Sequence, residues 1–99
     1  MKRKLTSSHD EAIIRRLRKD AAFAAEYLKT TLEDEDDPRV LLIALRHLVQ
    51  AEGIAKVAKV AGVERESLYR ALSLRGNPRL STLIAVTKAI GLRLTVEAA

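Results

Sequence analysis

Four polar side chains with the chemistry to recognise nucleic acid fall on one face of a helix that we expect over residues 64–73. They recur at the spacing of neighbours on a helix surface and stand opposite Leu68, Ala71 and Leu72. The four are Arg65, Glu66, Tyr69 and Arg70. A guanidinium matches the two acceptors of a guanine, and a carboxylate accepts from the amino group of a cytosine. This face can therefore reach base edges and grip phosphates.

A second short helix precedes this one. Residues 54–61 place Ile54 and Val57 on an inner face and two lysines on the outer face. Gly62 can adopt the left-handed conformation of a tight turn, and Val63 is expected to be buried behind it. This order is typical of a helix-turn-helix, whose second helix enters the major groove of DNA.

Positive charge concentrates in the same half of the chain. Residues 1–52 hold ten basic and ten acidic side chains, whereas residues 53–96 hold eight basic and two acidic ones. With Glu97 the whole chain has a formal net charge of +5. Six residues beside the turn and the loop are expected to contact phosphates: Lys56, Lys59, Ser67, Arg75, Asn77 and Arg79. The alternative is that these cations form an ordinary solvated surface.

The front half has the pattern of helices. Ser8 and Glu11 have the spacing of a capping box, and an apolar stripe continues to Leu32, either as one bent helix or as two helices. The acidic run of residues 33–37 ends in Asp37-Pro38, which is a favourable start for the next helix. Capping and solubility explain this run, and contact with a basic protein partner is the alternative.

Two further helices complete the pattern. Residues 40–51 are apolar on most faces, which predicts a central buried helix with Arg46, His47 and Gln50 on its wetter side. Gly53 is expected to end it. We expect a last helix to be capped by Ser81 and stopped by Gly91.

The C-terminal end alternates apolar and polar residues from 92 to 97, which predicts a short strand. Such a strand has no ladder partner in an all-helical chain. It is therefore either a frayed tail or a dimer contact with a second copy, through Leu92, Leu94 and Val96. The expected organisation is a disordered tail (1–8), a helical extension (9–52), a helix-turn-helix unit (53–92), and a strand with its tail (93–99).

Composition excludes several classes of function. A chain of 99 residues makes one domain, and the absence of cysteine rules out disulfides and thiolate metal sites. His9 and His47 are isolated, Ser7, Ser8 and Ser67 have capping or surface positions, and no glycine-rich phosphate loop is present. We expect no enzyme, cofactor, metal or small-molecule substrate. With no signal peptide or membrane span in the sequence, we expect a cytoplasmic protein.

Residues 53–92 resemble the Xre/Cro type of helix-turn-helix, in the lambda-repressor-like fold. The resemblance rests on Val57-Ala58, Gly62-Val63, Asn77-Pro78 and Ile90-Gly91. More narrowly, the segment from Arg65 to Leu72, with Gly76-Asn77-Pro78 and residues 89–92, is similar to addiction-module antidote proteins of the HigA-like kind. The upstream residues 25–28, followed by an acidic stretch with Asp-Pro and an Ala/Leu-rich helix, extend the resemblance to residues 9–96.

The resemblance implies an all-α, five- to six-helix bacterial antitoxin. Such a protein represses its own operon as a DNA-bound dimer and neutralises a RelE-like toxin encoded beside it. Ile54 stands where many members have glutamine, and Val60 where a polar residue is usual. Val60 lies either on the outer side of its helix or against the helix of residues 40–51. The alternatives are a regulator without a toxin and a toxin-binding module with weak or no DNA binding.

Overall fold

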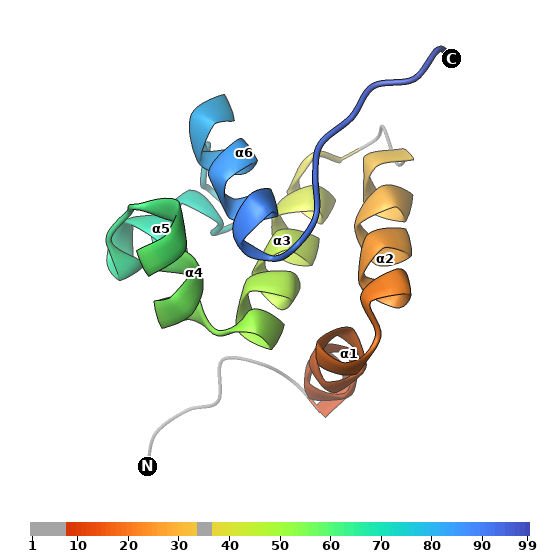
Figure 1. The fold of residues 1–99 in the computed structure, drawn as a ribbon, viewed down its shortest axis with the longest axis horizontal. Coiled ribbons are helices and arrows are strands. Elements are labelled where there is room, and N and C mark those ends of the chain that lie inside the picture. The colour runs from red at the N-terminus through yellow and green to blue at the C-terminus, as the bar shows by residue number, and fades with distance from the viewer. Residues whose placement is uncertain (1–7, 34–36) are drawn as a thin grey trace.

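The structure, a computed structural model, describes residues 8–33 and 37–99. Within this part the chain forms six helices joined by short connections (Figure 1). They are α1 (Ser8–Lys19), α2 (Ala21–Glu33), α3 (Arg39–Glu52), α4 (Ile54–Ala61), α5 (Arg65–Ala71) and α6 (Leu80–Ala89). The prediction of an all-helical chain is confirmed for these residues. None of these helices is long and apolar enough to cross a membrane.

Helix α3 stands at the centre of the molecule. It contacts α1 and α2 on one side and α4 on the other, so it separates the N-terminal helix pair from the last three helices (Figure 1). Most of its side chains from Leu42 to Ala51 are buried. The prediction of a central buried helix is confirmed, because a helix that is apolar on most faces needs neighbours on several sides.

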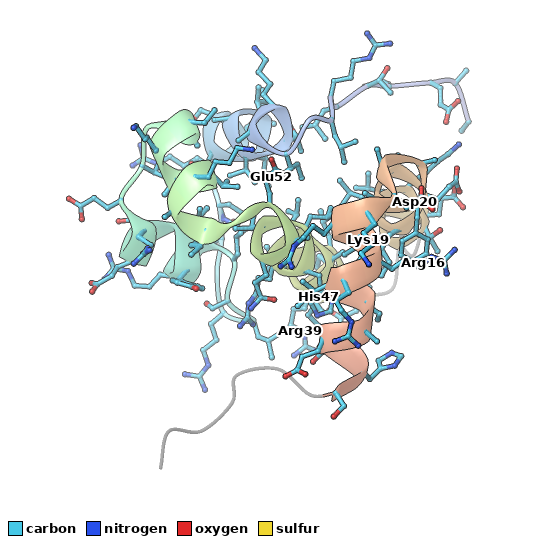
Figure 2. All side chains as sticks on the ribbon, turned by 60° about the horizontal axis from the view of Figure 1, so that its bottom comes forward. Arg16, Lys19, Asp20, Arg39, His47 and Glu52 are labelled. Atoms are coloured by element: carbon cyan, nitrogen blue, oxygen red, sulfur yellow. The ribbon has the colours of Figure 1, made fainter. Side chains whose placement is uncertain are left out.

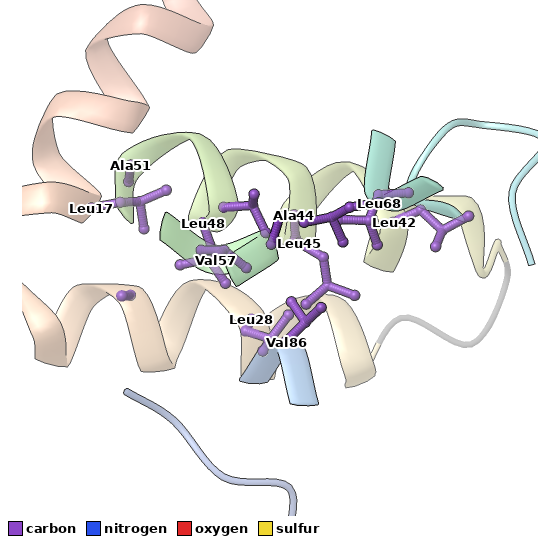
Figure 3. Packing of buried hydrophobic residues seen from close by; sticks show 14 residues of the cluster. Leu17, Leu28, Leu42, Ala44, Leu45, Leu48, Ala51, Val57, Leu68 and Val86 are labelled. Carbon is purple, nitrogen blue, oxygen red and sulfur yellow. The ribbon is translucent and has the colours of Figure 1, made fainter. Parts of the chain in front are cut away.

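One apolar core holds all six helices together. Figure 3 shows a row of side chains along α3, with residues from every other helix gathered around it. These are Leu17 of α1, Leu28 of α2, Val57 of α4, Leu68 of α5 and Val86 of α6. Val57, Leu68 and Val86 are each at most 1% exposed. Helix α5, which carries the polar face, is therefore fixed on the same core as α1 and α2.

The front apolar stripe forms two helices and not one bent helix. The break falls at Asp20, whose carboxylate Oδ1 accepts the backbone N–H of Phe23 at 3.0 Å. This bond satisfies one of the N–H groups that a helix start leaves without a partner. Asp20 therefore acts as the N-cap of α2.

The Asp37-Pro38 pair lies directly before α3, but the helix begins one residue later than predicted, at Arg39, with Pro38 at the cap position. Pro38 has helical backbone angles, and Asp37 Oδ1 accepts the backbone N–H of Arg39 at 3.0 Å. The guanidinium of Arg39 also donates to both oxygens of Asp37. This hydrogen bonding lowers the pKa of Asp37. Residues 34–36 of the acidic run lie outside the described residues, as do residues 1–7 of the predicted tail, while Ser8 is already the first residue of α1.

The start of the last helix differs from the prediction. Helix α6 begins at Leu80, one residue before Ser81, and extended Arg79 stands at its cap position with no side-chain cap bond. Ser81 is therefore inside the first turn and is not the cap. At the other end the prediction is confirmed: Gly91 has φ +80°, and the N–H of Leu92 bonds to the carbonyl of Thr87 at 2.9 Å.

The predicted C-terminal strand is absent from the single chain. Residues 92–99 have no regular secondary structure, and the described residues contain no strand. The physical reason is that a strand needs a hydrogen-bonded neighbour, and this chain contributes only one such segment. In Figure 1 the tail leaves α6, crosses the view in front of α3 and α2, and projects beyond the helices.

Candidate nucleic-acid interface

The turn between α4 and α5 fixes the helix that carries the polar face. Gly62 ends α4 in the left-handed conformation, with φ +72° and ψ +31°. The N–H of Val63 then bonds back to the carbonyl of Ala58 at 3.0 Å, which is the pattern of a Schellman cap. Glu64 returns to an extended conformation, and α5 begins at the next residue. Three residues therefore connect the two helices.

Replacing Gly62 by alanine is expected to destabilise the protein by about 1–2 kcal/mol, the cost of a left-handed residue that has a Cβ atom. No atom lies within 4 Å of a Cβ built at this position, so a steric clash adds nothing to this cost. Asparagine tolerates the conformation better and should lose less stability. Urea unfolding of the Gly62→Ala and Gly62→Asn variants measures both effects, and equal losses would contradict this explanation.

Helix α5 has one buried side and one exposed side. Leu68 and the following Leu72 are each 1% exposed and pack into the core. The predicted contact residues Arg65, Glu66, Tyr69 and Arg70 are all exposed. Their exposure agrees with the helical spacing in the sequence. Their contact with DNA stays a prediction.

The two arginines of this face are available for an external anion. Within the described parts of the chain, no carboxylate lies within ion-pair distance of Arg65 or Arg70. Arg70 makes one long contact of 3.5 Å, from Nη2 to the Oγ atom of Ser67. A guanidinium without a fixed acidic partner can turn both its donors toward a base or a phosphate.

The flanking residues differ in how freely they can contact a phosphate. Lys59, Arg75, Asn77 and Arg79 are exposed, whereas Ser67 is half-buried. The Nζ atom of Lys56 lies 2.6 Å from a carboxylate oxygen of Glu52, one helical turn earlier. Exposed pairs of this kind contribute little free energy, so a phosphate can compete for this lysine.

Gly76 shapes the loop that carries Arg75, Asn77 and Arg79. A Cβ atom at this position would lie 2.0 Å from the carbonyl oxygen of Ala71, so only glycine lets the loop pass this close to the end of α5. The Gly76 N–H bonds to the carbonyl of Ser73 at 2.8 Å. The loop is therefore held against the C-terminal end of α5.

The two residues that depart from the Xre/Cro pattern, Ile54 and Val60, differ in their exposure. Val60 is 62% exposed, so it lies on the outer side of α4 and does not pack against α3. Ile54 is half-buried and packs against the core at the start of α4. An apolar side chain at Val60 leaves an uncharged patch next to Lys59.

The sequence did not reveal a polar cluster between the first three helices. His47 was expected on the wetter side of α3, but it is 7% exposed. Its Nδ1 atom lies 2.6 Å from the hydroxyl of Tyr27, and its Nε2 atom 3.2 Å from a carboxylate oxygen of Asp10. Figure 2 labels the side chain of His47 among those of the neighbouring helices. The available signal was position 47 itself, which shares a helix face with Ala44 and Ala51, both buried.

Stability is expected to fall as the pH drops below about 6.5, the ordinary pKa of histidine. Burial lowers the pKa of His47, and the carboxylate of Asp10 opposes this only in part. Between pH 6.5 and the lowered pKa of His47 in the folded protein, the folded protein binds fewer protons than the unfolded chain. The free energy of unfolding therefore decreases as the pH falls through that window. Unfolding in urea at several pH values measures this. His47→Gln should flatten the dependence, and an unchanged dependence in this variant would contradict the explanation.

Fold and site together define a class: within the described residues, a small helical protein whose last three helices carry the surplus of positive charge and whose N-terminal helix pair is neutral. Residues 8–98 match the family described as "Probable addiction module antidote protein". The chain belongs to this family, which supports an antitoxin role and implies a toxin partner.

A relative from Haemophilus influenzae (strain ATCC 51907 / DSM 11121 / KW20 / Rd) is 39% identical over 71 residues. The alignment covers 72% of each chain, and the relative is described as an uncharacterized protein. No solved structure matches the chain. The described residues contain no group of three or more side chains that could hold a metal ion.

Proposed function

We propose that this protein is the antitoxin of a type II toxin–antitoxin module and represses its own operon by binding operator DNA. One observation carries the DNA-binding part: α5 presents, beside Tyr69 and Glu66, two arginines that have no acidic partner among the described residues, while Leu68 and Leu72 anchor its other side in the core. We assign a lambda-repressor-like arrangement to α4 and α5, in which α5 is the recognition helix.

In this proposal the base contacts come from Arg65, Glu66, Tyr69 and Arg70. The cations of α4 and of the loop after α5 bind phosphates and set the position of α5 in the groove. The charge distribution supports this assignment, because residues 53–96 carry a surplus of six positive charges and residues 1–52 carry none. A homodimer would present two copies of α5 to half-sites about 34 Å apart.

We propose that the N-terminal helices bind the toxin. Family membership implies such a partner. The front half has no net charge, and its acidic run suits a partner with a basic surface. A RelE-like toxin, which acts on RNA, has the chemistry that we expect of this partner. In this scheme the protein acts by binding, and we assign no catalytic role to any residue.

Co-expression of the protein with the product of the adjacent gene tests the proposal. We expect the two proteins to purify together and the growth arrest caused by the toxin to be relieved. The Arg65→Ala/Arg70→Ala variant should still relieve the arrest, because α3 separates the N-terminal helices from α5.

Other outcomes would select an alternative function. A protein that binds its promoter but neutralises no toxin would be a regulator without a toxin partner. A protein that neutralises the toxin but does not bind its promoter would be a toxin-binding module, and the exposed Val60 on α4 would then be the feature that favours protein over DNA.

A further inference from the structure

An open apolar groove of about 820 Å³ runs between α2 and the C-terminal tail. Its α2 wall includes Leu28 and Leu32, and its tail wall includes Leu92 and Leu94. Leu32 is 53% exposed and Leu94 is 42% exposed, while Val96 just beyond is 95% exposed. Apolar side chains gathered in this way beside an extended segment are typical of an interaction surface.

Beyond Leu92, the backbone of the tail has no hydrogen-bond partner among the described residues. The last backbone hydrogen bond that joins it to the helices runs from the N–H of Leu92 to Thr87. From residue 93 onward, no backbone group of the tail bonds to another described residue. Such a segment has a row of free donors and acceptors that another strand can pair with.

We propose that the occupant of this surface is the same tail of a second copy, paired antiparallel with Thr95 on the two-fold axis. In this register Arg93 of each copy faces Glu97 of the other, so the pairing contains two ion pairs. On the opposite side of the ribbon, Leu94 of each copy faces Val96 of the other. The sequence of the tail is therefore complementary to itself in both charge and apolar character.

Neighbouring registers lose this match. A shift by one residue places apolar side chains opposite polar ones, because side chains alternate between the faces of a strand. Centring the pairing on Leu94 keeps the apolar face but places Arg93 opposite Thr95 and Glu97 opposite Gly91. Among these registers, only the one centred on Thr95 pairs both charges.

The groove supplies what a two-stranded ribbon lacks. A ribbon of two strands is at best marginally stable in water without a layer to pack against. Leu92 packs on the core at the root of the tail, and Leu94 follows on the same side of the strand, so the apolar face of the ribbon continues toward Leu28 and Leu32. The second copy therefore adds both a strand and apolar cover to the groove.

This inference rests on the proposed function in one respect, since two copies of α5 on one two-fold axis are what a palindromic operator requires. The dimer itself can be measured without DNA or toxin, so the two proposals can fail separately.

Single cysteines in this cysteine-free chain test the register under mild oxidation. Thr95→Cys should form a covalent dimer, because the two Cβ atoms on the axis come within the range of a disulfide. Arg93→Cys alone and Glu97→Cys alone should not, because like positions lie four residues apart along the ribbon. An equimolar mixture of those two variants should form the mixed disulfide. Covalent dimers of all three single variants, or of none, would overturn the proposal.

Charge reversal tests the same pairing without a disulfide. Arg93→Glu should raise the dimer dissociation constant about tenfold in sedimentation equilibrium, because two attractive pairs become repulsive. Adding Glu97→Arg should restore dimerisation by exchanging the charges. A monomeric wild-type chain that still neutralises its toxin would overturn this inference and leave the proposed function standing. A dimer that binds neither toxin nor promoter would overturn the proposed function and leave this inference standing.

Discussion

Replacing Arg65 and Arg70 together by alanine should weaken binding to the promoter of the protein's own operon by roughly 30-fold or more. Each bidentate contact between an arginine and a guanine contributes about 1–3 kcal/mol of discrimination. Both arginines are exposed, and neither has an acidic partner among the described residues that would offset the loss. Fluorescence anisotropy with a labelled promoter fragment at about 150 mM salt measures the change.

A matched control removes the same charge from the other half of the molecule. Arg15 and Lys19 are exposed residues of α1, so Arg15→Ala/Lys19→Ala changes the net charge equally and leaves α5 intact. We expect this control to bind the promoter nearly as well as the unchanged protein. Equal losses in the two double variants would mean that the net charge, and not the face of α5, determines binding.

The second large effect is expected at the centre of the core. Leu45→Ala should lower the free energy of unfolding by about 2–5 kcal/mol, because the substitution leaves a cavity in a packed interior. Leu45 is 1% exposed on α3, the helix that separates the two halves. A protein of this size is stable by only about 5–15 kcal/mol, so this loss would remove a large share of its stability.

Urea unfolding followed by circular dichroism measures this loss. Ile43 lies two residues earlier on the same helix and is 38% exposed, so Ile43→Ala is the matched control and should cost far less. One core joins all six helices, and we therefore expect a single transition with an unchanged slope in denaturant. Separate transitions for the N-terminal and C-terminal helices would contradict a shared core.

Sequence patterns predicted the helices and where several of them end. Apolar spacing placed α3 at the centre and gave α4 its bounds, because burial on one side of a helix repeats every 3.6 residues. Gly53, Gly62 and Gly91 each follow a helix and have positive φ, which other residues seldom adopt. These signals are local, so they can be recognised from a few neighbouring residues.

Features that depend on distant partners could not be predicted in this way. The burial of His47 depends on Asp10 and Tyr27, which lie on two other helices. The strand expected after Leu92 did not form, because strand pairing needs a second segment that the single chain lacks. The predicted cap at Ser81 was wrong, because α6 begins one residue earlier at Leu80.

At the candidate site, the sequence predicted which residues share a face but not how they are held. The helical spacing of Arg65, Tyr69 and Arg70 was enough to place them together and exposed. The pairing of Lys56 with Glu52 was not predicted, although their spacing of four residues would have indicated it. The close approach of Gly76 to Ala71 requires the path of the loop, which residue types alone do not determine.

The most direct test of the DNA-binding claim compares two duplexes of the same length and composition. One is the protein's own promoter fragment and the other is a shuffled sequence, and both are titrated with the unchanged protein at about 150 mM salt. Specific DNA-binding proteins prefer their sites by about 10³-fold or more, and we expect a preference of this order. Equal affinity for the two duplexes would contradict recognition by α5 and leave an antitoxin that does not read its operator.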